Sequence, residues 1–253
     1  MSVLGAGMAS ADVQAGLDQL KAQKFEEAVA SFQGVFEQGD GDGAFYLGRM
    51  VELGLGIDAD AKRASVIYAA AIEKNSALAM NRLGLMHLAG DGVLQDYTRG
   101  AELICKSADL GNTDAQFNCA NLYLQGKGVE ADASKAAEWL IKASEKKHVA
   151  AMNFLGLAYL NGRGVEADRE KAKALFLQTA DLGNAMGLYQ FGLLHINAPE
   201  GEADLVKAHA YMNLAAERGF PQAGEIRASL EETLEPEDVV RAQIIARDWS
   251  AAS

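Results

Sequence analysis

GKGVEAD, at residues 126–132, follows a stretch with helical spacing and places two glycines around a lysine. Taken alone, it resembles a loop that holds a phosphate group. Similar heptads recur with a spacing of 36 residues: GLGIDAD at 54–60, GDGVLQD at 90–96 and GRGVEAD at 162–168. A degenerate copy at 198–204, APEGEAD, keeps the aspartate and lacks both glycines. A phosphate site needs such a loop once, whereas evenly spaced copies indicate a repeat architecture.

The segments on both sides of each loop have the apolar spacing of amphipathic helices. Before the loop, a pair such as Leu155-Gly156 recurs with the same period, and after it a pair such as Lys171-Ala172 does so. Each unit is therefore predicted to contain helix A, a glycine loop, helix B and a short turn. Glycine inside a helix costs about 1 kcal/mol relative to alanine. Its recurrence in helix A predicts a close approach of the small residues in helix B.

The loop residues have structural roles in this scheme. The first glycine ends helix A in the left-handed conformation, and the second allows the chain to reverse. The aspartate caps helix B, which stabilises it by about 1 kcal/mol relative to alanine. The loop glycines are Gly54, Gly56, Gly90, Gly92, Gly126, Gly128, Gly162 and Gly164, and the capping aspartates are Asp60, Asp96, Asp132, Asp168 and Asp204. Helix B is expected to end near residues 39, 75, 111, 147, 183 and 219, where Lys147 is poorly suited to left-handed backbone.

The repeats define the predicted domain organisation. Residues 1–11 form a disordered tail or the remnant of a signal peptide, and residues 12–40 form a first helix pair with a shorter loop. Five repeats of 36 residues follow over 41–220, and charged capping helices occupy 221–253. The fold class is all-α, with about seven antiparallel helix pairs in one continuous array, since no repeat can bury its apolar face alone.

The full pattern is A-x3-LG-x2-Y-x2-G-x-GV-x2-D-x2-KA-x2-W, as in AAMNFLGLAYLNGRGVEADREKA at 150–172. It resembles the Sel-one-like repeat, a relative of the tetratricopeptide repeat, from about residue 41 to 223, and the first helix pair resembles a tetratricopeptide unit. Departures from the family pattern are Ala198 and Glu200 in the fifth loop, Cys119-Ala120 in place of Leu-Gly, and His87 and His195 in place of tyrosine.

The resemblance implies a right-handed superhelical solenoid with a concave face, acting as an adaptor in protein–protein interactions without catalytic residues. Bacterial members are often exported and serve cell-envelope or signalling assemblies. The predicted function is therefore a non-catalytic scaffold that binds an extended peptide or a partner domain along the concave helix A face. The alternative is a regulatory subunit or inhibitor that docks on an envelope enzyme through its loops or an end cap.

In tetratricopeptide-like arrays, certain positions of helix A line the concave groove. The matching positions in this chain mix amides with aromatic rings, which suits a peptide because amides both donate and accept hydrogen bonds. The predicted partner-binding residues are Asn81, Arg82, Phe117, Asn118, Asn121, Gln125, Asn153, Phe154, Asn161, Tyr189 and Gln190. The other interpretation is that the asparagines are ordinary surface residues and that the rings seal contacts between repeats. The protein is expected to be a monomer or a weak end-to-end dimer.

Composition excludes several other functions. A net charge of −12 disfavours binding to nucleic acid or to an anionic membrane. The sequence contains no run of 18 apolar residues, so no membrane insertion is expected. No metal or cofactor is expected, because neither His-Glu-x-x-His nor Cys-x-x-Cys occurs. Ser144 and Lys147 match a Ser-x-x-Lys motif but lack the elements that accompany it in enzymes. The histidines in the tyrosine positions, His87 and His195, are expected to be half-buried structural residues.

Two features bear on the cellular compartment. Ala9-Ser10-Ala11 fits the pattern read by signal peptidase. The segment before it lacks the basic start and most of the apolar length of a complete signal peptide. A periplasmic or secreted location is therefore predicted, with the cytoplasm as the alternative. Cys105 and Cys119, the two cysteines of the chain, lie about the Gly111-Asn112 turn. They form either a disulfide or two core thiols, and both alternatives stay open.

Overall fold

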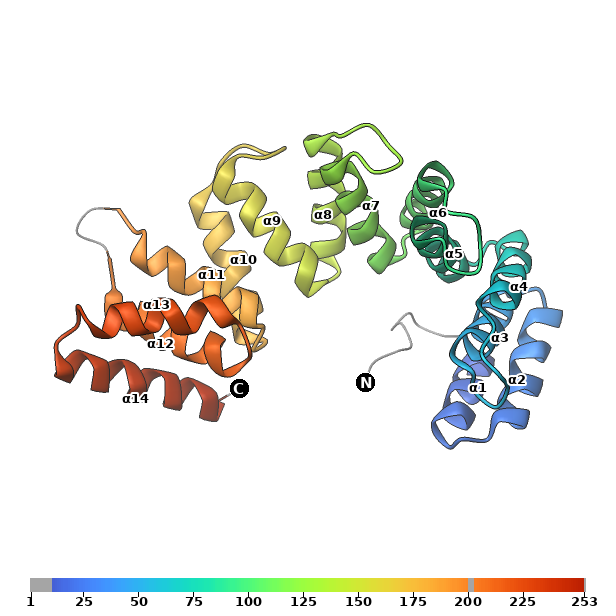
Figure 1. The fold of residues 1–253 in the computed structure, drawn as a ribbon, viewed down its shortest axis with the longest axis horizontal. Helices are drawn as coiled ribbons and strands as arrows, with labels where there is room; N and C mark the ends of the chain where they lie inside the picture. The colour runs from blue at the N-terminus through green and yellow to red at the C-terminus, as the bar shows by residue number, and fades with distance from the viewer. Residues whose placement is uncertain (1–10, 200–202, 253) are drawn as a thin grey trace. The chain divides into compact units, whose positions relative to one another are not determined.

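The computed structural model describes residues 11–199 and 203–252 (Figure 1). In this part of the chain there are fourteen α-helices and no strand, so the predicted all-α repeat solenoid is confirmed. The helices are α1 (Ala11–Lys21), α2 (Phe25–Glu37), α3 (Gly41–Leu53), α4 (Ala61–Glu73), α5 (Ala77–Ala89), α6 (Tyr97–Asp109), α7 (Thr113–Gln125), α8 (Ala133–Glu145), α9 (Val149–Asn161), α10 (Arg169–Asp181), α11 (Ala185–Ile196), α12 (Leu205–Glu217), α13 (Pro221–Glu231) and α14 (Pro236–Ala252). The signal remnant predicted over residues 1–11 lies, except for Ala11, outside the described residues, as does Glu200 of the fifth loop.

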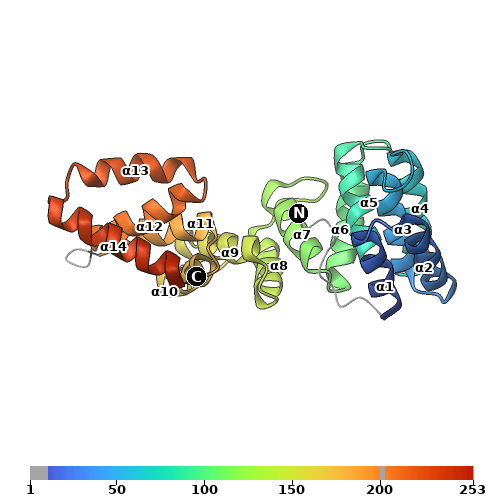
Figure 2. The same cartoon turned by 90° about the horizontal axis from the view of Figure 1, so that it is seen from below.

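The chain divides into two compact units, residues 1–142 and 143–253. In the first unit α1 packs on α2, α3 on α4 and α5 on α6, and successive pairs meet through α2 and α3, α4 and α5, and α6 and α7. In the second unit α9 packs on α10 and α11 on α12, and α10 meets α11. Helices α13 and α14 both pack on α12, as can be followed in Figure 2. Each unit is thus a stack in which a helix pair contacts its neighbours in sequence.

Helix B contributes one large side chain per repeat to the core. These side chains are spaced by 36 residues, and each is at most 1% exposed: Phe32, Tyr68, Ile104, Leu140, Phe176 and Met212. The same side chains explain several glycines of helix A. A Cβ at Gly48 or Gly156 would collide with the ring of Tyr68 or Phe176. The expected approach of the small helix B residue is closest at Gly84, which faces the backbone oxygen of Gly100. At Gly48 and Gly156 the large ring, rather than the small residue, requires glycine.

The loop after α7 illustrates how each repeat turns. Gly126 ends α7 in the left-handed conformation, with φ of 65°. Gly128 lies so close to Tyr97 at the start of α6 that a Cβ would collide with the Tyr97 carbonyl oxygen. Asp132 then caps α8, and its Oδ1 accepts hydrogen bonds from the backbone N–H groups of Ser134 and Lys135, both at 3.0 Å. The second glycine therefore brings the loop against the preceding helix B.

All five loop aspartates are N-caps. Besides Asp132, the side chains of Asp60, Asp96, Asp168 and Asp204 each accept a hydrogen bond of 2.9 Å from the backbone N–H three residues later. Every B helix from α2 to α12 is followed by a residue with positive φ, at Gly39, Asn75, Gly111, Lys147, Gly183 and Gly219. The φ of Lys147 is 60°, so the lysine that was expected to fit poorly does adopt the left-handed conformation.

Candidate partner-binding faces

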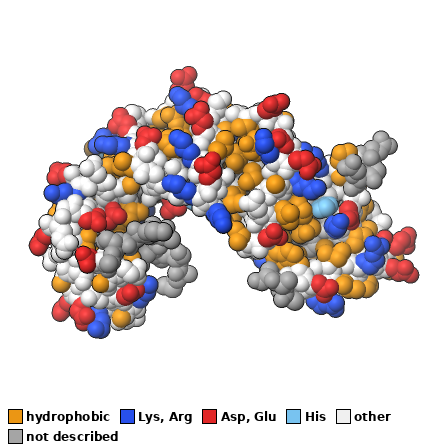
Figure 3. Space-filling view, turned by 180° about the vertical axis from the view of Figure 1, so that it is seen from behind, with side chains coloured by type: hydrophobic (Ala, Val, Ile, Leu, Met, Phe, Trp, Pro, Cys, Tyr) orange, Lys and Arg blue, Asp and Glu red, His pale blue; other side chains and the backbone are white. Residues whose placement is uncertain are grey.

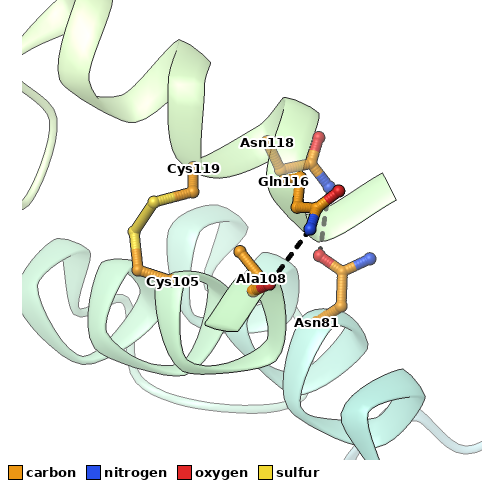
Figure 4. Close-up of a disulfide and its surroundings, with 6 residues drawn as sticks. All are labelled: Asn81, Cys105, Ala108, Gln116, Asn118 and Cys119. Atoms are coloured by element: carbon orange, nitrogen blue, oxygen red, sulfur yellow. Dashed lines mark hydrogen bonds between the residues drawn. A yellow bond between two sulfur atoms is a disulfide. The ribbon is translucent and has the colours of Figure 1, made fainter. Parts of the chain in front are cut away.

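The helix A face of the first unit is defined here by six predicted residues on α5 and α7: Asn81, Arg82, Phe117, Asn118, Asn121 and Gln125. Asn118 of α7 donates a hydrogen bond through Nδ2 to Oδ1 of Asn81 on α5, at 3.1 Å (Figure 4). Both side chains are half-buried, and the hydrogen bond between them links the A helices of two neighbouring repeats. Asn121 and Gln125 lie one and two turns farther along α7, with Asn121 half-buried and Gln125 exposed.

Arg82 is held by an ion pair within the unit. Its guanidinium donates to the Glu52 carboxylate of α3, which also accepts hydrogen bonds from Arg49, at 2.8 Å, and from the Tyr68 hydroxyl. The Glu52 side chain is 7% exposed, whereas that of Arg82 is 32% exposed. One carboxylate therefore faces two guanidinium groups, and Arg82 keeps part of its surface in contact with solvent.

The Glu52 network perturbs the titration of its members. Burial alone would raise the pKa of Glu52, but the hydrogen bonds from Arg82 and Tyr68 and the charges of both arginines hold it below 4.5 overall. Burial and the neighbouring carboxylate raise the pKa of Tyr68 above its ordinary value, so its hydroxyl stays protonated and donates. The network fixes α3, α4 and α5 relative to one another.

The predicted site residues of the second unit are Asn153, Phe154, Asn161, Tyr189 and Gln190, on α9 and α11. The prediction for Asn153 is wrong, because its side chain is only 1% exposed. Its Oδ1 accepts from the Thr179 hydroxyl at 2.7 Å, and its Nδ2 donates to Oδ1 of Asn184 at 2.8 Å. Both ends of the amide are satisfied inside the unit, so Asn153 holds α9 to α10 and to the cap of α11.

The other four residues of the second unit remain at least partly accessible. Tyr189 stacks on Phe220, with ring centroids 4.4 Å apart, so one side of its ring is covered. Asn161 is exposed and donates to the carbonyl oxygen of Leu157 in its own helix, at 2.9 Å. Phe154 and Gln190 are half-buried. The structure thus brings accessible amides and rings onto the A helices of each unit.

The chain is acidic overall, with a net charge of −12, but acidic and basic side chains are mixed on the surface (Figure 3). Figure 3 shows acidic and basic side chains interspersed over one face of the molecule. Several lysines of helix B pair with the aspartate that caps the same helix, as Lys171 does with Asp168 at 3.2 Å. The ammonium of Lys171 also lies 5.2 Å from the centroid of the Tyr159 ring on helix A, and Lys135 has the same relation to Tyr123. The recurring lysine and tyrosine of the repeat therefore hold helices A and B together.

The two histidines of the tyrosine position are half-buried. Nδ1 of His87 lies 3.2 Å from the carbonyl oxygen of Leu94 in its own loop. His195 stacks on Tyr211, and burial lowers its pKa.

Among the described residues, no group of three or more His, Cys, Asp or Glu side chains is arranged to hold a metal ion. Lys127, which first indicated a phosphate loop, lies over the Tyr97 ring at 4.5 Å.

Cys105 of α6 and Cys119 of α7 form a disulfide, with their Cα atoms 5.1 Å apart (Figure 4). Of the two alternatives left open by the sequence, the structure contains the bridge. It spans the junction between two repeats, because α6 ends one repeat and α7 begins the next. Gln116, also on α7, is buried and donates to the carbonyl oxygen of Ala108 at 3.3 Å, while its own Oε1 has no partner within the described structure.

Sequence reasoning missed Glu52, which organises the first helix A face. A signal was present, because the residues that correspond to Glu52 in the later repeats are Leu88, Leu124, Leu160 and Ile196. An acidic residue in an otherwise aliphatic position indicates a buried charge that needs a cationic partner. Comparing each position across the repeats would have revealed it.

The fold defines the class of this protein as an α/α repeat solenoid. The Sel1 repeat family model matches residues 41–76, 77–112, 113–148, 149–184 and 185–220, and the chain belongs to this family. None of the curated proteins compared with the chain matches it. No helix within the described ranges is long and apolar enough to cross a membrane.

Two solved structures share the fold with a TM-score of 0.78. One is a protective antigen of uropathogenic Escherichia coli with an SLR fold, 23% identical; the match covers 94% of this chain and 53% of the antigen, so this chain spans about half of its length. The other is a Sel1 repeat protein from Oxalobacter formigenes, 22% identical, with 94% of this chain and 97% of that chain covered. At these identities the likeness concerns the fold.

Proposed function

We propose that this protein is a non-catalytic scaffold of protein–protein interaction, which binds an extended peptide or a partner domain along its helix A faces. The observation that carries the proposal is the arrangement of amides on α7. Asn121 and Gln125 follow the Asn118–Asn81 pair along one side of the helix, and neither has a hydrogen-bond partner for its side chain within the described structure. Such amides supply the donors and acceptors that a peptide backbone requires.

We restrict the proposed contacts to side chains that are accessible in the structure. Asn153 is withdrawn from the proposed contacts because it is buried. Arg82 contributes only the edge of its guanidinium, because Glu52 occupies the rest. In the first unit, the proposed contacts are therefore centred on Asn118, Asn121 and Gln125, with the ring of Phe117 on the same helix.

We also propose that the protein works in a bacterial cell envelope or in another exported setting. The Cys105–Cys119 disulfide supports this location, because such bonds persist in oxidising compartments. The proposal is tested by whether this disulfide forms in the native cell. Alkylation of free thiols before and after reduction, followed by mass spectrometry, should show both cysteines protected before reduction.

The helix A proposal is tested with a binding partner isolated from the native organism. The full-length protein serves as bait, and captured proteins are identified by mass spectrometry and then purified. The Asn121→Ala/Gln125→Ala variant should weaken binding of the purified partner. A matched control is Lys106→Ala/Asp109→Ala, which changes two exposed residues on α6. Equal binding by both variants and the wild type would exclude the helix A face of the first unit.

A regulatory subunit that docks through its loops or end cap is the second candidate. It is favoured by apolar side chains outside helix A: Leu94, in the second loop, is 89% exposed, and Val240 and Ile244 are exposed on α14. Hydrogen exchange of the complex separates the two candidates. A peptide on the helix A face protects amides of α5 and α7, whereas edge docking protects the loops or α13 and α14.

A further inference from the structure

The first unit contains an apolar groove away from the helix A face. It lies between α2, α3 with its following loop, and α4, and has a volume of about 440 Å³. Its apolar lining includes Phe25 and Val29 of α2, Leu47 of α3, Leu55 and Ile57 of the loop, and Ile67 of α4. This volume falls within the range of protein binding pockets, and the apolar lining provides the usual driving force for association.

The two walls of the groove carry opposite charges. Glu26 lines it from α2 and Arg63 from α4, and both side chains are exposed. Neither side chain forms an ion pair with another described residue. A ligand that fills the groove would therefore meet an unpaired negative charge on one side and an unpaired positive charge on the other.

Two repeats later, the surface that corresponds to this groove is covered by side chains of the protein itself. There, Tyr97 replaces Phe25 and Lys127 replaces Leu55, and the Lys127 ammonium lies 4.5 Å from the centre of the Tyr97 ring. The residues that correspond to Gln33 and Leu47 are Cys105 and Cys119, which are joined by the disulfide. The first groove has neither the lysine nor the bridge. Its loop has the apolar Leu55 in place of that lysine, and Ile57 of the same loop is 41% exposed.

We propose that this groove binds a peptide segment of a partner protein. Apolar side chains of the peptide enter between α2 and α4, a basic residue faces Glu26, and an acidic residue faces Arg63. The two opposite charges favour a peptide over a fatty acid, because a single carboxylate would satisfy Arg63 and leave Glu26 without a partner. This binding surface is separate from the helix A face and does not depend on it.

The test uses a displayed library of random short peptides, selected on the full-length protein. Enriched peptides are synthesised with a fluorescent label, and their affinity is measured by fluorescence anisotropy. We expect them to carry apolar residues between a basic and an acidic residue. Leu55→Lys, which introduces the lysine of the third repeat, should weaken binding about tenfold or more. The matched control is Val66→Lys, which changes a 67% exposed residue of α4 outside the groove and should leave affinity unchanged.

Exchange of the rim charges, by Glu26→Lys with Arg63→Glu, should reverse the order of the charges in the selected peptides. Circular dichroism checks that each variant is folded, and Ile57→Lys replaces Leu55→Lys if the latter is not. The proposal is overturned if no peptide is enriched, or if the enriched peptides bind the lysine variant as tightly as the wild type. It is also overturned if dodecanoate binds in a Leu55-dependent manner and displaces the peptides, which would indicate a lipid site.

Discussion

Glu52→Ala is expected to lower the free energy of unfolding of the first unit by about 3 kcal/mol. The substitution leaves the guanidinium groups of Arg49 and Arg82 without their carboxylate, and it removes the acceptor of the Tyr68 hydroxyl. Breaking a buried ion pair by removing one partner costs about 3–5 kcal/mol. The lower end applies because Arg82 is 32% exposed and regains hydration once it is released.

Urea unfolding followed by circular dichroism at neutral pH measures this loss. Glu102→Ala is the matched control, because Glu102 also pairs with an arginine three residues before it but lies on the surface. The control should cost less than about 1 kcal/mol, as exposed ion pairs do. Adding Arg82→Leu to Glu52→Ala should restore part of the stability, because it removes one unpaired charge. The reasoning is refuted if Glu52→Ala costs no more than Glu102→Ala.

Acid should remove the same stabilisation. The pKa of Glu52 in the folded protein lies below its ordinary value of 4.5. The unfolded chain therefore binds the proton more readily, so this contribution is complete above that value and is lost as the pH falls through the folded pKa. Glu52→Gln should flatten this part of the stability profile in urea unfolding measured from pH 7 down to acid.

Three further changes test the loops, the helix ends and the bridge. Asp132→Ala should lower the unfolding free energy by about 1 kcal/mol through loss of the α8 cap. ATP and GTP should leave the melting temperature of the wild type unchanged, and a rise in that temperature with either nucleotide would indicate that the loop does bind phosphate. Lys147→Gly should raise stability by about 1 kcal/mol, because it relieves left-handed backbone at an exposed lysine, and a loss in thermal melting would contradict this. Cys105→Ser with Cys119→Ala should lower the unfolding free energy by about 3 kcal/mol, whereas equal stability of the variant and the oxidised wild type would show that the bridge contributes nothing.

The fold could be predicted because its determinants repeat. Each loop glycine and each capping aspartate occurs at the same phase of a period of 36 residues, so the role of one copy indicates the role of the others. For a feature that occurs once, such as Glu52, comparison of the repeats shows an exception to the pattern but does not identify its partners. Glu52, Arg82 and Tyr68 lie on three different helices, and only the packed structure brings them together.

The candidate site was predicted less well than the fold. Spacing along helix A assigned Asn153 and Asn121 to one surface, but it carries no information about the helix B residue that faces each position. Thr179 supplies the hydroxyl that Asn153 contacts, whereas the residues at this position of the earlier B helices are Val35, Ala71, Ser107 and Ala143, and the Ser107 hydroxyl donates to the Ala77 carbonyl oxygen. The direction of a side chain in such an array depends on its neighbour in the adjacent helix, which varies from repeat to repeat.

The disulfide between α6 and α7 has a consequence for how the first unit loses its structure. In a stack whose repeats contact mainly their neighbours, unfolding can begin at one end and progress from one junction to the next. A covalent bond across one junction makes the two adjoining repeats open together, so fraying that begins at α1 should stop before α5. Under reducing conditions that barrier is absent, and the cooperativity of unfolding should fall even where the native contacts are the same.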